Sequence, residues 1–469
     1  MIEERAGSVN RAPIAAHLDS TPRVDDHTAV TTSWQGLLDE IRAQRAVIGV
    51  IGMGYVGLPL ALAFAERGFS VLGFDVDPGK VEKIMRGEGY IKHLDPSRVA
   101  AAVGAGRLSA TADFARLGEP DAILVCVPTP LTPQREPDMS YVVDTARRIR
   151  AVLRRGQLVV LESTTYPGTT DELMREILEE SGHKLGDDFL LAFSPEREDP
   201  GNKSYHTATI PKVVGGVDAA SAEVALALYD QVIASTVAVS SARTAEAVKL
   251  TENVFRAVNI ALVNELKVVY DRMGIDIWEV LDAAATKPFG FMRFNPGPGW
   301  GGHCIPLDPF YLAWKAREFG VSTRFVELAG EVNVRMPEYV VEKLMLGLND
   351  RGRAMKGSRV LVLGLAYKKD IDDPRESPAF EVIDKILRLG AAVSYHDPHV
   401  PRAPRMRSWP HLPPMASEPL TADLLQAVDA VVVVTDHSAV DYDLVAEHAR
   451  LVVDTRGVYR APRANVVKA

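Results

Sequence analysis

The sequence predicts an α/β protein in which two Rossmann-like, doubly wound domains are joined by a central helical domain. Strand-length apolar runs alternate with helical segments in two separate parts of the chain, and a long stretch of helical periodicity lies between them. At about 150 residues per domain, a chain of 469 residues has room for roughly three domains.

The first two segments follow from composition and pattern. Residues 1–45 are predicted to form a flexible extension, with one short amphipathic helix over residues 33–44. From residue 46 the runs AVIGVIG, SVLGFDVD, AILVCVP and QLVVLEST indicate buried strands with helices between them. Residues 46–240 are therefore predicted to be the first α/β domain.

The rest of the chain changes character twice. Residues 241–355 are predicted to be the helical domain, in which Pro337 either kinks a helix or marks a boundary. Strand-like runs return in SRVLVLGLAYKKD, AAVSYHDP, AVVVVTDH and RLVVDTRGV. Residues 356–469 are therefore predicted to be a second α/β domain.

Composition and charge exclude several classes of protein. Hydrophobic residues make up 47% and charged residues 25%, which is the balance of a globular chain. The 53 basic and 62 acidic residues give a net charge of −9, so no nucleic-acid partner is expected. No apolar run approaches the roughly 18 residues that span a bilayer, and neither a signal peptide nor a metal-ligand spacing is present. We expect a cytoplasmic protein with reduced thiols.

A glycine motif follows the first predicted strand. Gly52 suits a tight turn, Gly54 lets the backbone approach a diphosphate, and Gly57 lets helix and strand pack closely. Asp75 closes the second strand 18 residues after Gly57, and a carboxylate there binds ribose hydroxyls and favours NAD over NADP. The alternative is a glycine turn that binds no ligand.

The second α/β domain lacks this motif. Lys368, Lys369 and Arg375 stand where the first domain has glycines. These cations suit a phosphate-bearing ligand or the far side of the same cofactor. A solvated basic turn is the alternative.

Two cysteines differ in their surroundings. Cys126 lies in an apolar strand, where a free cysteine behaves as a small hydrophobe. Cys304 follows GWGGH, and consecutive glycines can direct backbone N–H groups at one point, which lowers a thiol pKa and holds an oxyanion. A structural loop ending in a buried cysteine fits this segment equally well. His303 is interpreted as a structural or supporting residue, because adjacent side chains usually point apart.

Lys249 and Asn253 share one face of the long predicted helix. They interrupt an apolar stripe, so they either point into a cleft or form a solvated pair. A buried lysine beside Cys304 would stabilise a thiolate and an oxyanion.

These segments in this order resemble the UDP-glucose/GDP-mannose dehydrogenase family. The resemblance covers residues 46–460 and rests on the following segments: VIGMGYVGLPLA, FDVD, CVPTP, ESTTYPGTT, SPEREDPGN, AEAVKLTENVFRAVNIALVNE, GPGWGGHCIPLDP, GLAYKKDIDDPRESP and VDTRG. It implies that two NAD+ oxidise C6 of a nucleotide sugar to the uronic acid through a thiohemiacetal and a thioester on Cys304.

The resemblance also implies roles for particular residues. The implied catalytic residues are Cys304, Lys249, Asn253, Asp308, Glu196 and Thr164. The implied NAD-binding residues are Gly52, Gly54, Val56, Gly57, Asp75, Lys80, Thr129 and Arg375. The implied UDP-sugar-binding residues are Lys249, Asn253, Arg293, Gly301, Lys368 and Arg456. A homodimer or a higher homo-oligomer is expected.

The expected substrate is a UDP-N-acetylhexosamine. The segment KPFGFMRFNPGPGWGGHCIPLDP is more similar to that branch than to the UDP-glucose branch, and most similar to UDP-N-acetylglucosamine 6-dehydrogenases. UDP-glucose, UDP-N-acetylgalactosamine and UDP-N-acetylmannosamine remain alternatives. Two other classes are a two-electron hydroxyacid dehydrogenase, which needs no Cys304, and a non-catalytic NAD-binding protein.

Overall fold

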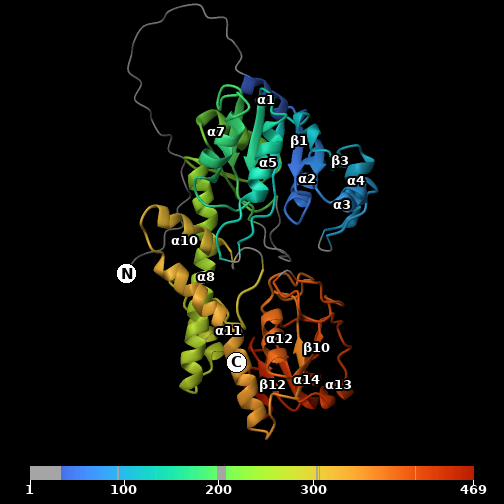
Figure 1. The fold of residues 1–469 in the computed structure, drawn as a ribbon, viewed down its shortest axis with the longest axis vertical. Helices are drawn as coiled ribbons and strands as arrows, with labels where there is room; N and C mark the ends of the chain where they lie inside the picture. The colour runs from blue at the N-terminus through green and yellow to red at the C-terminus, as the bar shows by residue number, and fades with distance from the viewer. Residues whose placement is uncertain are drawn as a thin grey trace, which may run out of the picture.

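Two sheets, the first mostly and the second entirely parallel, lie at opposite ends of the molecule, and long helices run alongside from one to the other (Figure 1). The structure is a computed structural model that describes residues 33–91, 94–132, 134–197, 208–302, 305, 307–406 and 408–469. The predicted fold class, with two Rossmann-like domains around central helices, is confirmed. The helix expected over residues 33–44 forms α1 (Ser33–Arg42), and residues 1–32 of the predicted extension lie outside the described residues.

The first sheet has eight strands in the order β3-β2-β1-β4-β5-β6-β7-β8. Their bounds are β1 (Val47–Ile51), β2 (Ser70–Phe74), β3 (Leu108–Thr111), β4 (Ala122–Val125), β5 (Gln157–Leu161), β6 (Phe189–Phe193), β7 (Lys212–Gly216) and β8 (Thr236–Ala238). All neighbours pair in parallel except β6 and β7, which are antiparallel. The chain runs outward from β1 to β2 and β3 and then returns to β4, so the carboxyl ends of β1 and β4 form the switch point where ligands of such sheets bind.

Helices cover both faces of this sheet, which explains why its inner strands are apolar without alternation. The helical elements are α2 (Gly57–Glu66), α3 (Pro78–Met85), α4 (Pro96–Gly104), η1 (Phe114–Gly118), α5 (Ser140–Arg150), η2 (Thr169–Met174), α6 (Arg175–Glu179) and α7 (Ala219–Tyr229). Strands β4, β5 and β6 are buried along their whole length. This layering holds the glycine turn after β1 at a fixed place on the sheet edge.

The central helices connect the two sheets. They are α8 (Ala242–Arg272), α9 (Ile277–Ala284), α10 (Asp308–Glu318) and α11 (Arg324–Asn349). The Ser241 side chain caps α8 by accepting from the Thr244 N–H. Helices α8 and α11 pack side by side, with a buried 2.8 Å hydrogen bond from Asn264 to Asn333. Helix α11 continues through Pro337, so this proline lies inside a helix and is not a boundary.

The second sheet has the order β10-β9-β11-β12-β13, with every pair parallel. Its strands are β9 (Arg359–Leu363), β10 (Ala392–His396), β11 (Ala430–Val433), β12 (Val452–Asp454) and β13 (Val466–Lys468). Its helices are α12 (Pro378–Arg388), α13 (Ala422–Ala427) and α14 (Tyr442–His448). The switch point between β9 and β11 opens toward the loop at residues 364–377. None of the described helices combines the length and the apolar character that a bilayer crossing requires.

Candidate active site

The glycine turn after β1 has the geometry that the motif predicts. Gly52 has φ +90°, and a Cβ there would lie 2.5 Å from the Cys126 carbonyl oxygen. A Cβ on Gly57 would lie 2.0 Å from the Gly52 carbonyl oxygen, whereas one on Gly54 would meet no atom within 4 Å. Val56 occupies the N-cap of α2 without a side-chain cap. The turn therefore needs glycine at two positions for packing, and leaves an open backbone face at Gly54 beside a helix N-terminus.

Asp75 lies directly beyond β2, close to this turn. Its side chain is only 4% exposed and accepts hydrogen bonds from the N–H of Met53 at 3.0 Å and of Asp77 at 2.9 Å. Lys80 Nζ lies 3.1 Å from the same carboxylate. The predicted cofactor residues of the first domain thus form one group around the turn.

The second α/β domain reaches over this group. The Arg375 guanidinium carbon lies 4.2 Å from the centroid of the Tyr55 ring, and Tyr55 is inside the glycine motif. Asp373 holds Arg375 through two hydrogen bonds of 2.8 and 2.6 Å. The motif prediction did not assign Tyr55, although its place next to Gly54 was the available signal.

Thr129 joins the first domain to the central helices. Its carbonyl oxygen accepts a 2.9 Å hydrogen bond from the Tyr311 hydroxyl of α10. Tyr311 is buried. Its contact with Thr129 was not predicted from the sequence. The loop after β4 is thereby fixed beside the helix that begins at Asp308.

Lys249, Asn253 and Asp308 form a buried polar cluster. Their exposures are 8%, 5% and 4%, so the interpretation of Lys249 and Asn253 as a solvated pair is wrong. The Asn253 amide donates a hydrogen bond to the Asp308 carboxylate. Burial raises the pKa of Asp308 to about 6, and the charge of Lys249 acts in the opposite direction. A carboxyl group with this pKa can exchange a proton near neutral pH.

The glycine-rich loop before Asp308 lies against the second α/β domain. A Cβ on Gly301 would lie 2.9 Å from both Tyr367 Cβ and Pro378 Cδ, and one on Gly302 would lie 2.9 Å from the Tyr367 ring. Cys304 and His303, which belong to this loop in sequence, lie outside the described residues. The position of the predicted nucleophile therefore stays a prediction.

Arg456 contacts the glycine-rich loop at Gly297. Its Nε donates a 2.6 Å hydrogen bond to the Val434 carbonyl, and a Cβ on Gly297 would lie 2.6 Å from its Nη1. The N–H of Gly297 donates to Asn264 Oδ1 at 2.9 Å, which ties the loop to α8. Lys368 directly follows Tyr367, so two predicted substrate-binding cations come from loops that contact the glycine-rich segment.

Arg293 is placed differently from the other predicted substrate-binding residues. Its partners in the described part of the chain are Asp282 and Asn295, neither of which belongs to the buried cluster. Arg460 also lies 3.3 Å from Asp282. Arg293 therefore lies in a charged surface group at α9.

Thr164 and Glu196 follow β5 and β6 at the carboxyl edge of the first sheet. Thr164 is half-buried, and the preceding Ser163 hydroxyl donates to the Val127 carbonyl at 2.7 Å. Glu196 lies in the electrostatic field of the buried ion pair between Lys212 and Glu162, whose charged atoms are 2.6 Å apart. The sequence analysis did not assign this buried pair.

Cys126 lies beside that pair. Burial raises the pKa of the Cys126 thiol well above its ordinary value, and the Glu162 carboxylate adds to this effect. The protonated thiol therefore predominates at neutral pH, which makes Cys126 a poor nucleophile.

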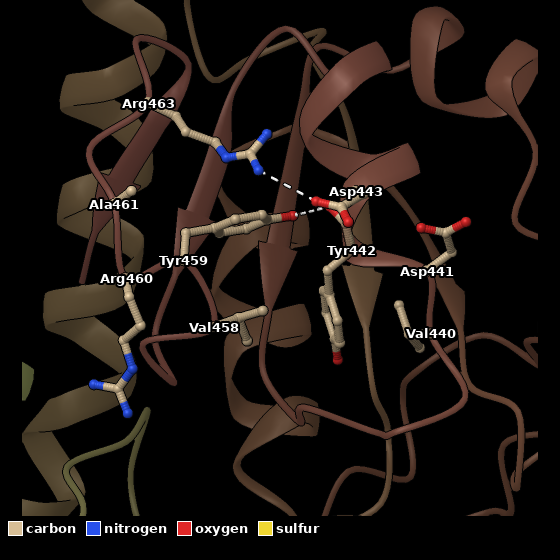
Figure 2. Close-up of a pocket in the computed structure, with 9 residues that line it drawn as sticks. All are labelled: Val440, Asp441, Tyr442, Asp443, Val458, Tyr459, Arg460, Ala461 and Arg463. Carbon is tan, nitrogen blue, oxygen red and sulfur yellow. Dashed lines mark hydrogen bonds and ion pairs between the residues drawn. The ribbon is translucent and has the colours of Figure 1, made fainter.

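A depression of about 530 Å³ lies beside the loops that follow β11 and β12 (Figure 2). The Tyr442 and Tyr459 rings meet edge to face there with centroids 6.4 Å apart, and Arg463 lies 3.2 Å from Asp443. It is lined by Val440, Asp441, Tyr442, Asp443, Val458, Tyr459, Arg460, Ala461 and Arg463. None of these is a predicted site residue.

Three side chains of the second domain, Asp370, His399 and His437, have ligand-type atoms within 4.8 Å of one another. His437 already uses both ring nitrogens, because Nδ1 accepts from the Asp370 N–H at 3.0 Å and Nε2 lies 3.1 Å from Asp397. Neither ring nitrogen of His437 is therefore free to bind a metal ion, which argues against a metal site in this group.

The chain matches three profiles of one family. These are the NAD binding domain of the UDP-glucose/GDP-mannose dehydrogenase family over residues 46–259, its central domain over 243–335, and its UDP binding domain over 361–461.

Curated relatives agree with this match. The chain is 36% identical to a UDP-N-acetyl-D-glucosamine 6-dehydrogenase of Pseudomonas aeruginosa over 77% of this chain and 85% of the relative. It is 37% identical to an NDP-N-acetyl-D-galactosaminuronic acid dehydrogenase of Ralstonia nicotianae over 89% and 97%. The solved UDP-D-ManNAc dehydrogenase of Pyrococcus horikoshii superposes with a TM-score of 0.81 at 32% identity, covering 90% of this chain and 98% of that one. The chain therefore belongs to the UDP-glucose/GDP-mannose dehydrogenase family and is an NAD-dependent nucleotide-sugar dehydrogenase.

Proposed function

We propose that this enzyme oxidises the C6 hydroxyl of a UDP-N-acetylhexosamine, with UDP-N-acetylglucosamine as the first choice, to the uronic acid. One observation carries the proposal: a single loop, residues 364–377, contacts both parts of the predicted site. Its Arg375 lies over the Tyr55 ring of the glycine turn, and its Tyr367 lies against Gly301 in the loop before the buried Lys249–Asn253–Asp308 cluster. The names of the relatives, which act on N-acetylglucosamine, N-acetylgalactosamine and N-acetylmannosamine derivatives, support the substrate class.

The described residues fit an NAD molecule at the glycine turn. Gly54 leaves its backbone face open, and Asp75 lies beyond the neighbouring strand, where the ribose of a dinucleotide is bound in this fold. Arg375 supplies a cation above the turn. Bound NAD+ supplies the hydride acceptor for both oxidation steps.

In the first oxidation, we assign removal of the C6 hydroxyl proton to Thr164 and Glu196. These two side chains either relay the proton or order the water molecule that accepts the proton. Loss of that proton and of a hydride from C6 leaves the aldehyde. Lys249 and Asn253 would donate hydrogen bonds to the C6 oxygen, where negative charge develops. Both side chains are buried, which strengthens such electrostatic stabilisation.

In the second oxidation, Cys304 carries the substrate. Its sulfur attacks the aldehyde carbon to give a thiohemiacetal, and loss of a second hydride gives a thioester. Asp308, with Lys249, then removes a proton from water, which attacks the thioester and releases the thiol. In total the alcohol, one water and two NAD+ give the carboxylic acid, two NADH and two protons.

The substrate's diphosphate requires cations. We assign Lys368 and Arg456 to it, because both belong to loops that contact the glycine-rich segment around Gly301. Arg293 would also bind the sugar nucleotide, and to do so it would have to leave its ion pair with Asp282.

The test is a panel of UDP-N-acetylglucosamine, its galacto and manno epimers, UDP-glucose and GDP-mannose with excess NAD+. We expect fastest turnover of UDP-N-acetylglucosamine, with two NADH formed per sugar consumed. A ratio of one would indicate a two-electron dehydrogenase, and absence of turnover across the panel would indicate a non-catalytic binder. Cys304→Ala should abolish uronate formation and keep NAD binding, while the matched control Cys126→Ala should keep both.

We further propose that the enzyme works in the cytoplasm as a homodimer or larger homo-oligomer, making uronic sugars for a polysaccharide or glycoconjugate. Phe255, Leu262 and Val269 recur every seven residues on α8 and are 49%, 52% and 40% exposed. A stripe of this kind fits a second copy of the helix. Sedimentation equilibrium should give at least twice the monomer mass, and Leu262→Glu should lower it.

A further inference from the structure

Among the described residues, three buried donors that make no hydrogen bond surround one small cavity between the central helices and the second sheet. They are Lys267 Nζ of α8, Trp278 Nε1 of α9 and the Tyr339 hydroxyl of α11. The exposures of Lys267 and Trp278 are 3% and 2%. Lys468 of β13 also lines the cavity. Buried polar groups in proteins are normally hydrogen-bonded, so a cluster of such donors requires an explanation.

The lining carboxylates do not neutralise Lys267, because other lysines already bind them. Lys343 Nζ lies 2.9 Å from both oxygens of Asp271, and Lys468 pairs with Asp276. Burial, reinforced by the charge of Arg456, lowers the pKa of Lys267 to about 7. Lys267 thus has no salt-bridge partner among the described residues, and the charges of Asp454 and Asp271 offset only part of the effect of burial.

The three donors, Lys267, Trp278 and Tyr339, determine what kind of ligand the cavity can bind. A lysine ammonium and an indole N–H can only donate. Burial and the neighbouring Asp271 carboxylate raise the pKa of Tyr339, so its hydroxyl also keeps its proton. The occupant must therefore accept hydrogen bonds from several directions at once. It must also be small, because the cavity holds about 30 Å³ and one water needs about 10–15 Å³ of such space.

We propose that this cavity binds a small monovalent anion of the halide type, chloride in a cellular setting, held by Lys267, Trp278 and Tyr339. A bound negative charge would hold Lys267 in its protonated form, and a halide accepts hydrogen bonds from every direction. A water molecule would satisfy some donors and leave the ammonium without a counter-charge.

The anion would join parts of two domains. Trp278 lies against Gly457, where a Cβ would be 2.3 Å from the indole ring, and Gly457 directly follows Arg456. Lys468 brings the last strand of the second sheet to the same place. The anion would therefore fix α9 and α11 against β13.

A bromide experiment tests the site directly. Crystals of the full chain soaked in sodium bromide should show an anomalous difference peak within hydrogen-bonding distance of Lys267 Nζ and Trp278 Nε1. The peak should be absent in Lys267→Met, which keeps the length of the side chain and removes the ammonium. An ordered water at this position with no anomalous signal would overturn the proposal.

A solution measurement covers the case in which Lys267→Met does not fold. Exchange of chloride between the cavity and the solvent should broaden the ³⁵Cl NMR signal, and bromide should reverse the broadening by competition. Trp278→Phe removes only the indole N–H among the donors and should reduce the broadening severalfold. The matched control Lys83→Met, on an exposed part of α3, should leave it unchanged. Equal broadening in wild type, Trp278→Phe and Lys83→Met would refute a halide at this site.

Discussion

Removing the Asn253 amide should move the acid limb of the pH–rate profile to higher pH. The Asn253 side chain donates to the Asp308 carboxylate, and this hydrogen bond stabilises the ionised form. With the bond present, burial still raises the pKa of Asp308 to about 6. If Asp308 must be ionised to activate water, the rate of the wild type should rise with pH through about 6. Asn253→Ala should require a higher pH for the same ionisation.

The size of the shift follows from the energy of the lost bond. A hydrogen bond to a charged group contributes about 1.5–3 kcal/mol, and 1.36 kcal/mol corresponds to one pKa unit. The limb should therefore move upward by about one to two pH units. Lys249 favours the ionised form in both proteins, so it limits the pKa of Asp308 in each but not the difference between them.

The assay is initial-rate NADH formation with UDP-N-acetylglucosamine from pH 5 to 9, read as kcat/KM. The maximal rate should also fall, because Asn253 is proposed to hold the oxyanion, so the midpoint of the limb is the informative quantity. Asn259→Ala is the matched control, since that amide bonds only to the Phe255 carbonyl on the exposed face of α8. A limb that stays at the wild-type pH in Asn253→Ala, with only a lower plateau, would refute the role of Asp308 as the titrating base.

Three further predictions concern the glycine turn. Gly57→Ala should destabilise the first domain by about 1–3 kcal/mol, seen as a lower Tm, because the new Cβ would lie 2.0 Å from the Gly52 carbonyl oxygen. Gly54→Ala should keep the wild-type Tm and weaken NADH binding in a fluorescence titration, since the space around it is open to a ligand; unchanged affinity would argue against diphosphate binding there. Arg375→Gln should weaken NADH binding by roughly 10- to 100-fold through loss of a charge-assisted contact, and a normal Kd would leave Arg375 with its contacts to Tyr55 and Asp373 alone among the described residues.

The strands around the glycine turn could be predicted because their signals are local. Residues 47–51 are a continuous apolar run followed by Gly52, and both the strand and the left-handed turn follow from these few residues. The pairing of Asn253 with Asp308 is different, because the two residues are 55 positions apart. Helical spacing placed Lys249 and Asn253 on one face but did not reveal which element covers that face. The packing of α10 against α8 determines that Asp308 covers this face, and such packing depends on the whole helical domain.

Strands β6 to β8 of the first sheet were harder to predict, because their pairing also depends on distant parts of the chain. Strand β8 has three residues, Thr236–Ala238, and none of them is buried. Such a strand has too little apolar pattern to distinguish it from a loop, and it forms because β7 offers an open edge. The antiparallel pairing of β6 and β7 likewise depends on where the chain returns to the sheet, which local sequence does not encode.

The glycines before Cys304 have a structural reason that the sequence argument did not contain. Consecutive glycines were interpreted as a way to direct N–H groups at one point, yet Gly301 and Gly302 also lie where any Cβ would press on Tyr367. Tyr367 directly precedes Lys368, and both belong to the loop that carries Arg375 over the glycine turn. A side chain in the cysteine loop would therefore displace the residues assigned to the substrate and the cofactor together. Small residues at this position allow one loop of the second domain to contact both the glycine turn and the glycine-rich loop.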